Sequence, residues 1–114
     1  MKKERKSLYE GMYIISATLS EDARKKAVEK ITQAIEEKGG EIHKIHEMGK
    51  KRLAYEIDKK REGYYYLIYF TVGTQHIEEL WSEYKLHEDL VRYITLQATE
   101  VVESLEFQPL NENA

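Results

Sequence analysis

Residues 64–72, which read Tyr-Tyr-Tyr-Leu-Ile-Tyr-Phe-Thr-Val, restrict the fold of this chain more than any other segment. They are rich in aromatic and β-branched residues, and this composition favours a β-strand. Successive side chains of a strand point to opposite faces, and here both alternating sets are apolar. A strand that buries both of its faces needs a neighbour on each side. Residues 64–72 are therefore predicted to form a central strand of a sheet.

The segment before this strand contains a further strand and a helix. Residues 8–19 are rich in Tyr, Ile and Met and are predicted to form a buried strand. Ser20 is a good helix N-cap, and the acidic pair Glu21-Asp22 that follows suits the first helical turn. Apolar residues then recur at helical spacing until Gly39-Gly40, which is typical of a helix end.

Residues 41–57 are predicted to be extended, with an irregularity near Gly49. Ile42 and Met48 before Gly49 are even-numbered, whereas Leu53, Tyr55 and Ile57 after it are odd-numbered. A β-bulge near Gly49 would reconcile the two halves, because a bulge adds one residue to one strand. The polar residues 58–63 then have the length of a hairpin connection.

The C-terminal part is predicted to contain a second helix and a last strand. Gly73-Thr74 opens the helix, whose apolar residues follow i, i+3, i+4, i+7 spacing: Ile77, Leu80, Trp81 and Tyr84. Residues 90–102 run or alternate in apolar character and are predicted to form the last strand. The order strand, helix, strand, strand, helix, strand predicts an α+β, ferredoxin-like βαββαβ fold, with a four-stranded antiparallel sheet and two helices packed on one face.

The composition indicates one small domain. The 114 residues are 41% hydrophobic, which is enough for one core, and we expect a basic N-terminal extension (residues 1–7), one domain (8–102) and a mobile C-terminal tail (103–114). The chain has no cysteine, so disulfides and cysteine-based metal sites are excluded. No apolar run is long enough to cross a membrane or to act as a signal sequence, and we expect a cytoplasmic location.

Charge is divided unevenly along the chain. Residues 1–61 hold 16 of the 18 Lys and Arg and 11 of the 21 Asp and Glu, so they carry +5, whereas residues 62–114 carry −8. The formal net charge of −3 taken alone argues against a nucleic-acid partner, because phosphate binding is driven by Lys and Arg. The basic runs 50–52 and 59–61 at a predicted bulge and hairpin nevertheless expose positive charge to a partner, although solvated surface charge is the simpler interpretation.

No arrangement of residues favours an enzyme or a metal centre. His43 and His46 are three residues apart on a predicted strand and would point to opposite faces, while His76 and His87 lie alone near the ends of the second helix, where surface or capping roles are expected. Ser16, Thr18 and Ser20 lack the glycine elbow of a nucleophile, and the paired carboxylates suit exposed helix positions. We expect no catalysis, metal, cofactor or small-molecule substrate.

The tyrosines allow two interpretations. Gly63-Tyr64-Tyr65-Tyr66-Leu67-Ile68-Tyr69 partly matches the aromatic signature of an RNA-recognition motif, in which Tyr13 and Tyr66 would stack on bases. Alternatively, the rings pack in the core and their hydroxyls reach solvent. The chain could thus be an independent RNA-recognition-type module that binds single-stranded RNA.

Particular motifs also resemble a known family. They are Tyr9-Glu10, Gly39-Gly40, the run Gly49-Lys50-Lys51-Arg52-Leu53-Ala54-Tyr55, Gly63-Tyr64-Tyr65 and Arg92. Together they resemble ribosomal protein six of the bacterial small subunit over residues 8–100. The resemblance implies a ferredoxin-like, ribosome-bound structural protein that binds ribosomal RNA of the central domain, as a heterodimer with the eighteenth small-subunit ribosomal protein, and supports subunit assembly.

The resemblance also implies two sets of site residues. Lys85 and Arg92 match basic positions of the family around the start of the last strand, and we expect them to bind RNA together with Lys6, Lys50 and Arg52. The long second strand is expected to be a sheet edge that an extended segment of the partner protein can join. The residues predicted for that edge are Ile42, Lys44, His46 and Met48.

Overall fold

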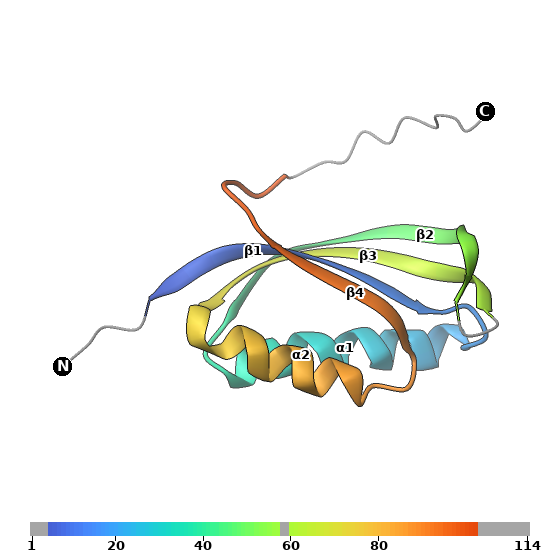
Figure 1. Ribbon diagram of the computed structural model, residues 1–114, viewed down its shortest axis with the longest axis horizontal. Coiled ribbons are helices and arrows are strands. Elements are labelled where there is room, and N and C mark those ends of the chain that lie inside the picture. Colours follow the sequence, from blue (N-terminus) through green and yellow to red (C-terminus); the bar gives the residue numbers. More distant parts are fainter. Residues whose placement is uncertain (1–4, 58–59, 103–114) are drawn as a thin grey trace.

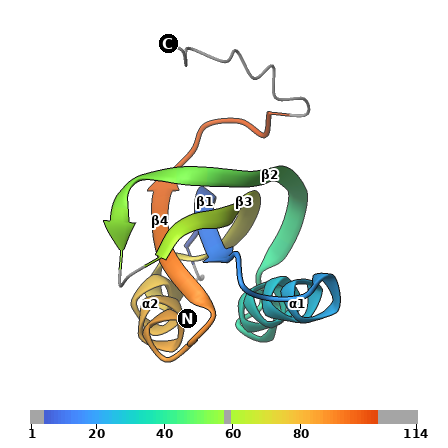
Figure 2. The ribbon, with the colours of Figure 1, turned by 90° about the vertical axis from the view of Figure 1, so that its right-hand side faces the viewer.

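The structure is a computed structural model that describes residues 5–57 and 60–102, with only the backbone described for residues 53–57, 60 and 61. Its elements are β1 (Lys6–Ser16), α1 (Glu21–Glu37), β2 (Glu41–Ile57), β3 (Lys60–Gly73), a short 3-10 helix (Thr74–His76), α2 (Ile77–Lys85) and β4 (Leu90–Gln97). The strands form one antiparallel sheet in the order β2-β3-β1-β4. Both helices cover one face of it, as Figures 1 and 2 show. The predicted ferredoxin-like fold is confirmed.

Strand β3 is central, as its two apolar faces predict. It pairs with β1 over all the residues from Gly63 to Gly73 and with β2 on its other side. Alternate side chains of β3 point to the helices and form the core with residues of α1 and α2: Tyr66, Ile68, Phe70 and Val72 with Ile31, Ile35, Leu80 and Tyr84. The two outer strands, β2 and β4, are the sheet edges, so the prediction that the second strand is an edge is also confirmed.

Helix α1 begins and ends where the sequence predicts. The Ser20 hydroxyl accepts a hydrogen bond from the Ala23 amide at 3.2 Å. At the other end, Gly39 has φ +81° and its amide donates to the Glu36 carbonyl, while the Gly40 amide donates to the Ile35 carbonyl. This pair of bonds is a Schellman motif, and its left-handed residue explains the glycine at position 39.

Strand β2 contains the predicted bulge and one more. The register with β3 shifts between Glu47 and Gly49, where Gly49 has φ +87°, so the bulge near Gly49 is confirmed. A second shift lies between Ile42 and Lys44, and the sequence pattern did not predict it. Each shift changes which face the following side chains occupy.

Three strands have boundaries that differ from the predictions. β1 runs from residue 6 to 16 rather than 8 to 19, because the Ser16 amide bonds the Asp89 carbonyl at 2.9 Å and the chain then turns into α1. β3 already begins at Lys60, so the hairpin strands extend into the predicted connector. β4 ends at Gln97 and not at Val102. The predicted tail, residues 103–114, lies outside the described residues.

Residues 98–102 form a strap, named so here because they cross the face of the sheet that the helices leave open (Figures 1 and 2). The Ala98 amide donates to the Leu8 carbonyl of β1 at 2.9 Å, and the Val102 carbonyl lies 2.6 Å from His46 Nε2 of β2. Between them, Tyr69 of β3 is only 2% exposed and donates its hydroxyl to Glu10 at 3.0 Å. Burial, and then Glu10, raise the pKa of Tyr69. The strap explains why residues 98–102 have apolar positions without being a strand.

A pair of buried tyrosines connects the sheet to α2. The hydroxyls of Tyr13 and Tyr84 lie 2.8 Å apart, and their rings meet edge to face. Burial raises the pKa of Tyr84 to about 12 and that of Tyr13 well above its usual value. Both hydroxyls therefore stay protonated at neutral pH, and each is the hydrogen-bond partner of the other.

We expect Tyr84→Phe to lower the free energy of unfolding by about 1 kcal/mol, because Tyr13 then loses a buried hydrogen-bond partner. Tyr13→Phe should have a similar cost. The double variant should lose less than the sum of the two, since neither hydroxyl is then left with a missing partner. Urea unfolding of the four proteins measures this, and strictly additive losses would show that the hydroxyls do not interact.

Candidate nucleic-acid interface

Four of the five residues predicted to bind RNA come from the same end of the sheet. Lys50 and Arg52 lie opposite Tyr64 and Glu62 near the β2–β3 hairpin. Gly63 lies beside them and pairs with Ser16 at the end of β1, and Arg92 pairs with Ile14 just before that end. Lys85 ends α2, which leads into β4 at this same end (Figure 1, right-hand side). Lys6 is the exception, because it begins β1 and lies at the opposite end.

The neighbouring lysines and arginine of β2 are divided between the two faces. Lys50 and Arg52 share the helix side of the sheet with Tyr64, whereas Lys51 pairs with Gly63 on the open side. The Lys50 ammonium lies 3.9 Å from a Glu62 carboxylate oxygen, and both side chains are half exposed. Such an exposed and distant ion pair contributes little to stability, so it leaves Lys50 available to a stronger anion.

Lys85 and Arg92 are both exposed but face different directions. Lys85 is the last residue of α2, on the helix side of the molecule. Arg92 lies on β4 opposite Ile14, and its side chain lines the open face of the sheet together with Met12, Ile14, Tyr65 and Ile94. The two residues can therefore contact one RNA only if it wraps around this end of the sheet.

Arg24 is a cation of the same region that the sequence analysis missed. Its guanidinium lies 3.8 Å from the centre of the Tyr64 ring, and its Nε donates to the Tyr66 hydroxyl at 2.9 Å. Helical periodicity places Arg24 at the start of α1, but only the three-dimensional structure brings it onto tyrosines 40 or more residues away. No local signal in the sequence could have found it.

The residues predicted for the partner edge all lie on β2, but they do not share one face. Ile42 pairs with the core residue Phe70 and points to the helices, whereas Lys44 and His46 pair with Tyr69 and Leu67 and point to the open side. Met48 lies at the bulge, without a residue directly opposite. Among the described strands, β2 pairs only with β3, so the backbone groups along its outer side have no strand neighbour.

The histidines differ from the expectation in two respects. His43 contacts the Thr71 hydroxyl at 2.6 Å and His46 contacts the Tyr69 ring, so both lie on the open side because of the bulge between Ile42 and Lys44. His87 is buried, with Nε2 at 3.3 Å from the Ala27 carbonyl, and is not a surface residue. No group of three potential metal ligands occurs within residues 5–57 and 60–102.

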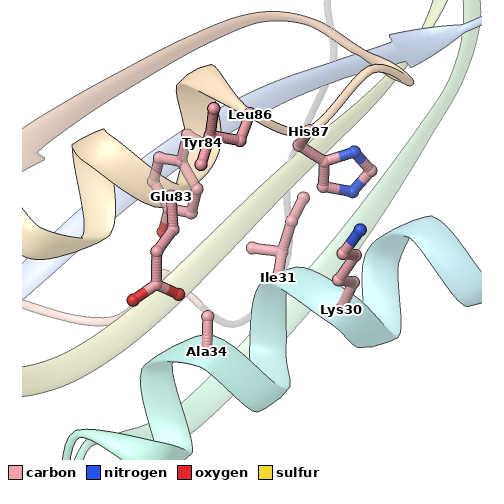
Figure 3. Close-up of a pocket in the computed structure, with 7 residues that line it drawn as sticks. All are labelled: Lys30, Ile31, Ala34, Glu83, Tyr84, Leu86 and His87. Carbon is pink, nitrogen blue, oxygen red and sulfur yellow. The ribbon is translucent and has the colours of Figure 1, made fainter.

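A cavity of about 230 Å³ lies between the helices beside His87 (Figure 3). Its walls come from α1 and from the end of α2 and the turn after it: Lys30, Ile31, Ala34, Glu83, Tyr84, Leu86 and His87. Glu83 is also bound to Lys38, at 2.5 Å. The cavity therefore lies between the two helices, and none of the predicted RNA-binding residues lines it.

The tyrosines proposed for base stacking are not available for it. Tyr13 is fully buried and Tyr66 is 5% exposed, both in the core between sheet and helices. The stacking prediction for these two residues is therefore wrong, and the core-packing interpretation holds for them. Tyr65, between Tyr64 and Tyr66 in the sequence, is the tyrosine of this run that points to the open side.

None of the described helices is long and apolar enough to span a membrane.

Comparisons with known proteins agree with the motifs. The family described as ribosomal protein S6 matches residues 8–97. The chain is 58% identical to the small ribosomal subunit protein bS6 of Protochlamydia amoebophila, with 98% of each chain covered, and 59% identical to that of Chlamydia muridarum, with 98% of this chain and 100% of the relative covered.

A solved structure agrees as well. The crystal structure of 30S ribosomal protein S6 from Thermotoga maritima superimposes with a TM-score of 0.77 at 36% sequence identity, over 82% of this chain and 89% of that one. The described sheet order, the helix placement and the sequence similarity over nearly the whole chain lead to one conclusion: this protein belongs to the ribosomal protein S6 family of the small ribosomal subunit.

Proposed function

We propose that this small-subunit ribosomal protein binds ribosomal RNA of the central domain jointly with the eighteenth small-subunit ribosomal protein and thereby supports subunit assembly, without catalysing a reaction. The observation that carries the proposal is the position of β2. It is a strand of 17 residues at the margin of the sheet, and its outer backbone groups have no strand neighbour among the described residues. Such a margin can accept one more strand from a partner.

The side chains along β2 favour a specific partner over uncontrolled association. Lys44 and the bulge at Gly49 are the kind of feature that keeps a sheet edge from pairing with copies of itself. A partner segment of the correct register would gain main-chain hydrogen bonds, and the side chains of Ile42, Lys44, His46 and Met48 would select it. This supports a defined heterodimer at this edge.

Positive charge at one end of the sheet supports an RNA partner. Lys50, Arg52, Lys85 and Arg92 are gathered there by the strand register, although the chain as a whole carries a net charge of −3. Phosphate contacts act locally, so these four cations can bind RNA although Glu62 and the Glu88-Asp89 pair lie at the same end. Lys6, at the opposite end, would contact a different part of the RNA.

We expect Lys85→Glu combined with Arg92→Glu to weaken RNA binding by the heterodimer and to leave thermal unfolding nearly unchanged, because both side chains are exposed. The slope of log affinity against log salt should fall by roughly one unit for each lost phosphate contact. A filter-binding titration at several salt concentrations measures both quantities.

The matched control is Lys26→Glu with Lys30→Glu, which makes the same charge change on the exposed face of α1. It should reduce affinity only through the change in net charge. Equal losses in the two double variants would mean that Lys85 and Arg92 make no specific contact.

We expect a proline at one of two adjacent positions of β2 to block the partner selectively. Backbone N–H groups of successive strand residues point alternately to the two sides, so Lys44→Pro and Ile45→Pro remove one inward and one outward donor. One variant should be less stable, because it loses a backbone hydrogen bond between β2 and β3. The other should fold normally but fail to form the heterodimer.

Urea unfolding and sedimentation of the mixed proteins distinguish the two variants. Normal heterodimer formation by the stably folded proline variant would remove the edge-pairing proposal, whatever the RNA measurements show.

A further inference from the structure

The open face of the sheet is divided into two regions. The strap covers the region around Tyr69 and His46. Beyond it, toward the β2–β3 hairpin, lies a hollow of about 260 Å³ lined by Met12, Ile14, Tyr65, Arg92 and Ile94. None of the strap residues lines this hollow, and Ile94 on its rim is 42% exposed.

Strand register explains how the hollow is built. One row across the sheet consists of four residues that lie directly opposite one another: Gly49 on β2, Tyr65 on β3, Ile14 on β1 and Arg92 on β4. Gly49 has no side chain, and no atom lies within 4 Å of the point where one would begin. No side chain at position 49 therefore covers Tyr65, and Met12, Ile14 and Ile94 form an apolar floor beside it.

Two cations lie near the hollow. Arg92 stands at one end of the row, and Lys51 is on the same face beside Gly63, one row closer to the hairpin. The described side chains of these two rows include no Asp or Glu. The carboxylate of Glu10 is on this face too, one row beyond Met12 and Ile94; it lines an adjoining hollow and accepts a hydrogen bond from Tyr69. A cation therefore stands on each side of an aromatic ring.

We propose that this hollow binds one unstacked nucleotide of RNA, with the base on the Tyr65 ring and the flanking phosphates beside Lys51 and Arg92. The inference rests on the proposed RNA-binding function and names a contact within it. Aromatic rings on an open sheet face stack on bases, and guanidinium and ammonium groups neutralise phosphates. The volume is slightly below the roughly 300–1,000 Å³ of typical small-molecule sites, which suits a single base.

An apolar side chain of a protein partner would fit the floor of Met12, Ile14 and Ile94, but it would gain nothing from the two cations. The paired positive charges at Lys51 and Arg92 favour a ligand that carries phosphate on both sides of a flat ring system. For this reason a nucleotide fits the hollow better than a peptide does.

The experiment uses the full-length protein with its partner protein and a set of central-domain RNA fragments, each carrying one 2-aminopurine at an unpaired position. Stacking on a ring quenches 2-aminopurine fluorescence. We expect one position to be quenched by the native protein and released in Tyr65→Leu, with RNA affinity about tenfold lower. Tyr65→Phe keeps the ring and should retain the quenching. Lys51→Gln should lower the salt slope by about one unit.

The outcomes separate this site from the function on which it rests. If the native heterodimer does not bind the RNA, the proposed function fails and this site fails with it. If it binds but Tyr65→Leu has the same affinity and the same quenching, only the nucleotide site is overturned. If Tyr65→Leu prevents heterodimer formation in sedimentation while thermal unfolding is unchanged, the hollow is a binding site for the partner protein. The nucleotide proposal is then overturned as well.

Discussion

The burial of β3 on both faces is the constraint on which the rest of this structure depends. Its helix-side residues, Ile68 and Phe70 among them, are fully buried against α1 and α2, and on the other face Tyr69 is covered by the strap. The backbone N–H and C=O groups of a strand buried in this way need hydrogen-bond partners, and β1 and β2 supply them on its two sides. With this strand order, β2 and β4 are the two edge strands of the sheet, and other molecules can pair with them.

Much of the fold follows from local patterns in the sequence. Three local features predicted the structure correctly, because each depends on interactions within a few residues: the two apolar faces of residues 64–72, the N-cap Ser20 and the helix end at Gly39-Gly40. The ends of β1, β3 and β4 could not be predicted from such local patterns. They are set by contacts between distant segments, such as the bond from Ser16 to Asp89, that no local pattern records.

Side-chain direction limited what could be predicted about the site. The extra residue between Ile42 and Lys44 turns His43 and His46 to the same face, contrary to simple alternation. Sequence analysis located the basic runs at the bulge and the hairpin, since exposed lysines and arginines collect at turns. It could not show that Lys51 lies on the other face of the sheet from Lys50 and Arg52, or Tyr65 on the other face from Tyr66. The face on which a side chain lies depends on the register of the whole sheet. Arg24 was missed for the same reason.

The strap connects the two margins of the sheet through contacts that lie outside the pairing of the strands. It is attached through Ala98 to β1 and through Val102 to His46, and Val101 and Val102 are only partly buried. Its release breaks none of the hydrogen bonds within the sheet or helices, so its free energy of opening is a small part of that for global unfolding. Release of the strap alone would therefore expose His46 and Tyr69 together, while the sheet and the helices stay folded.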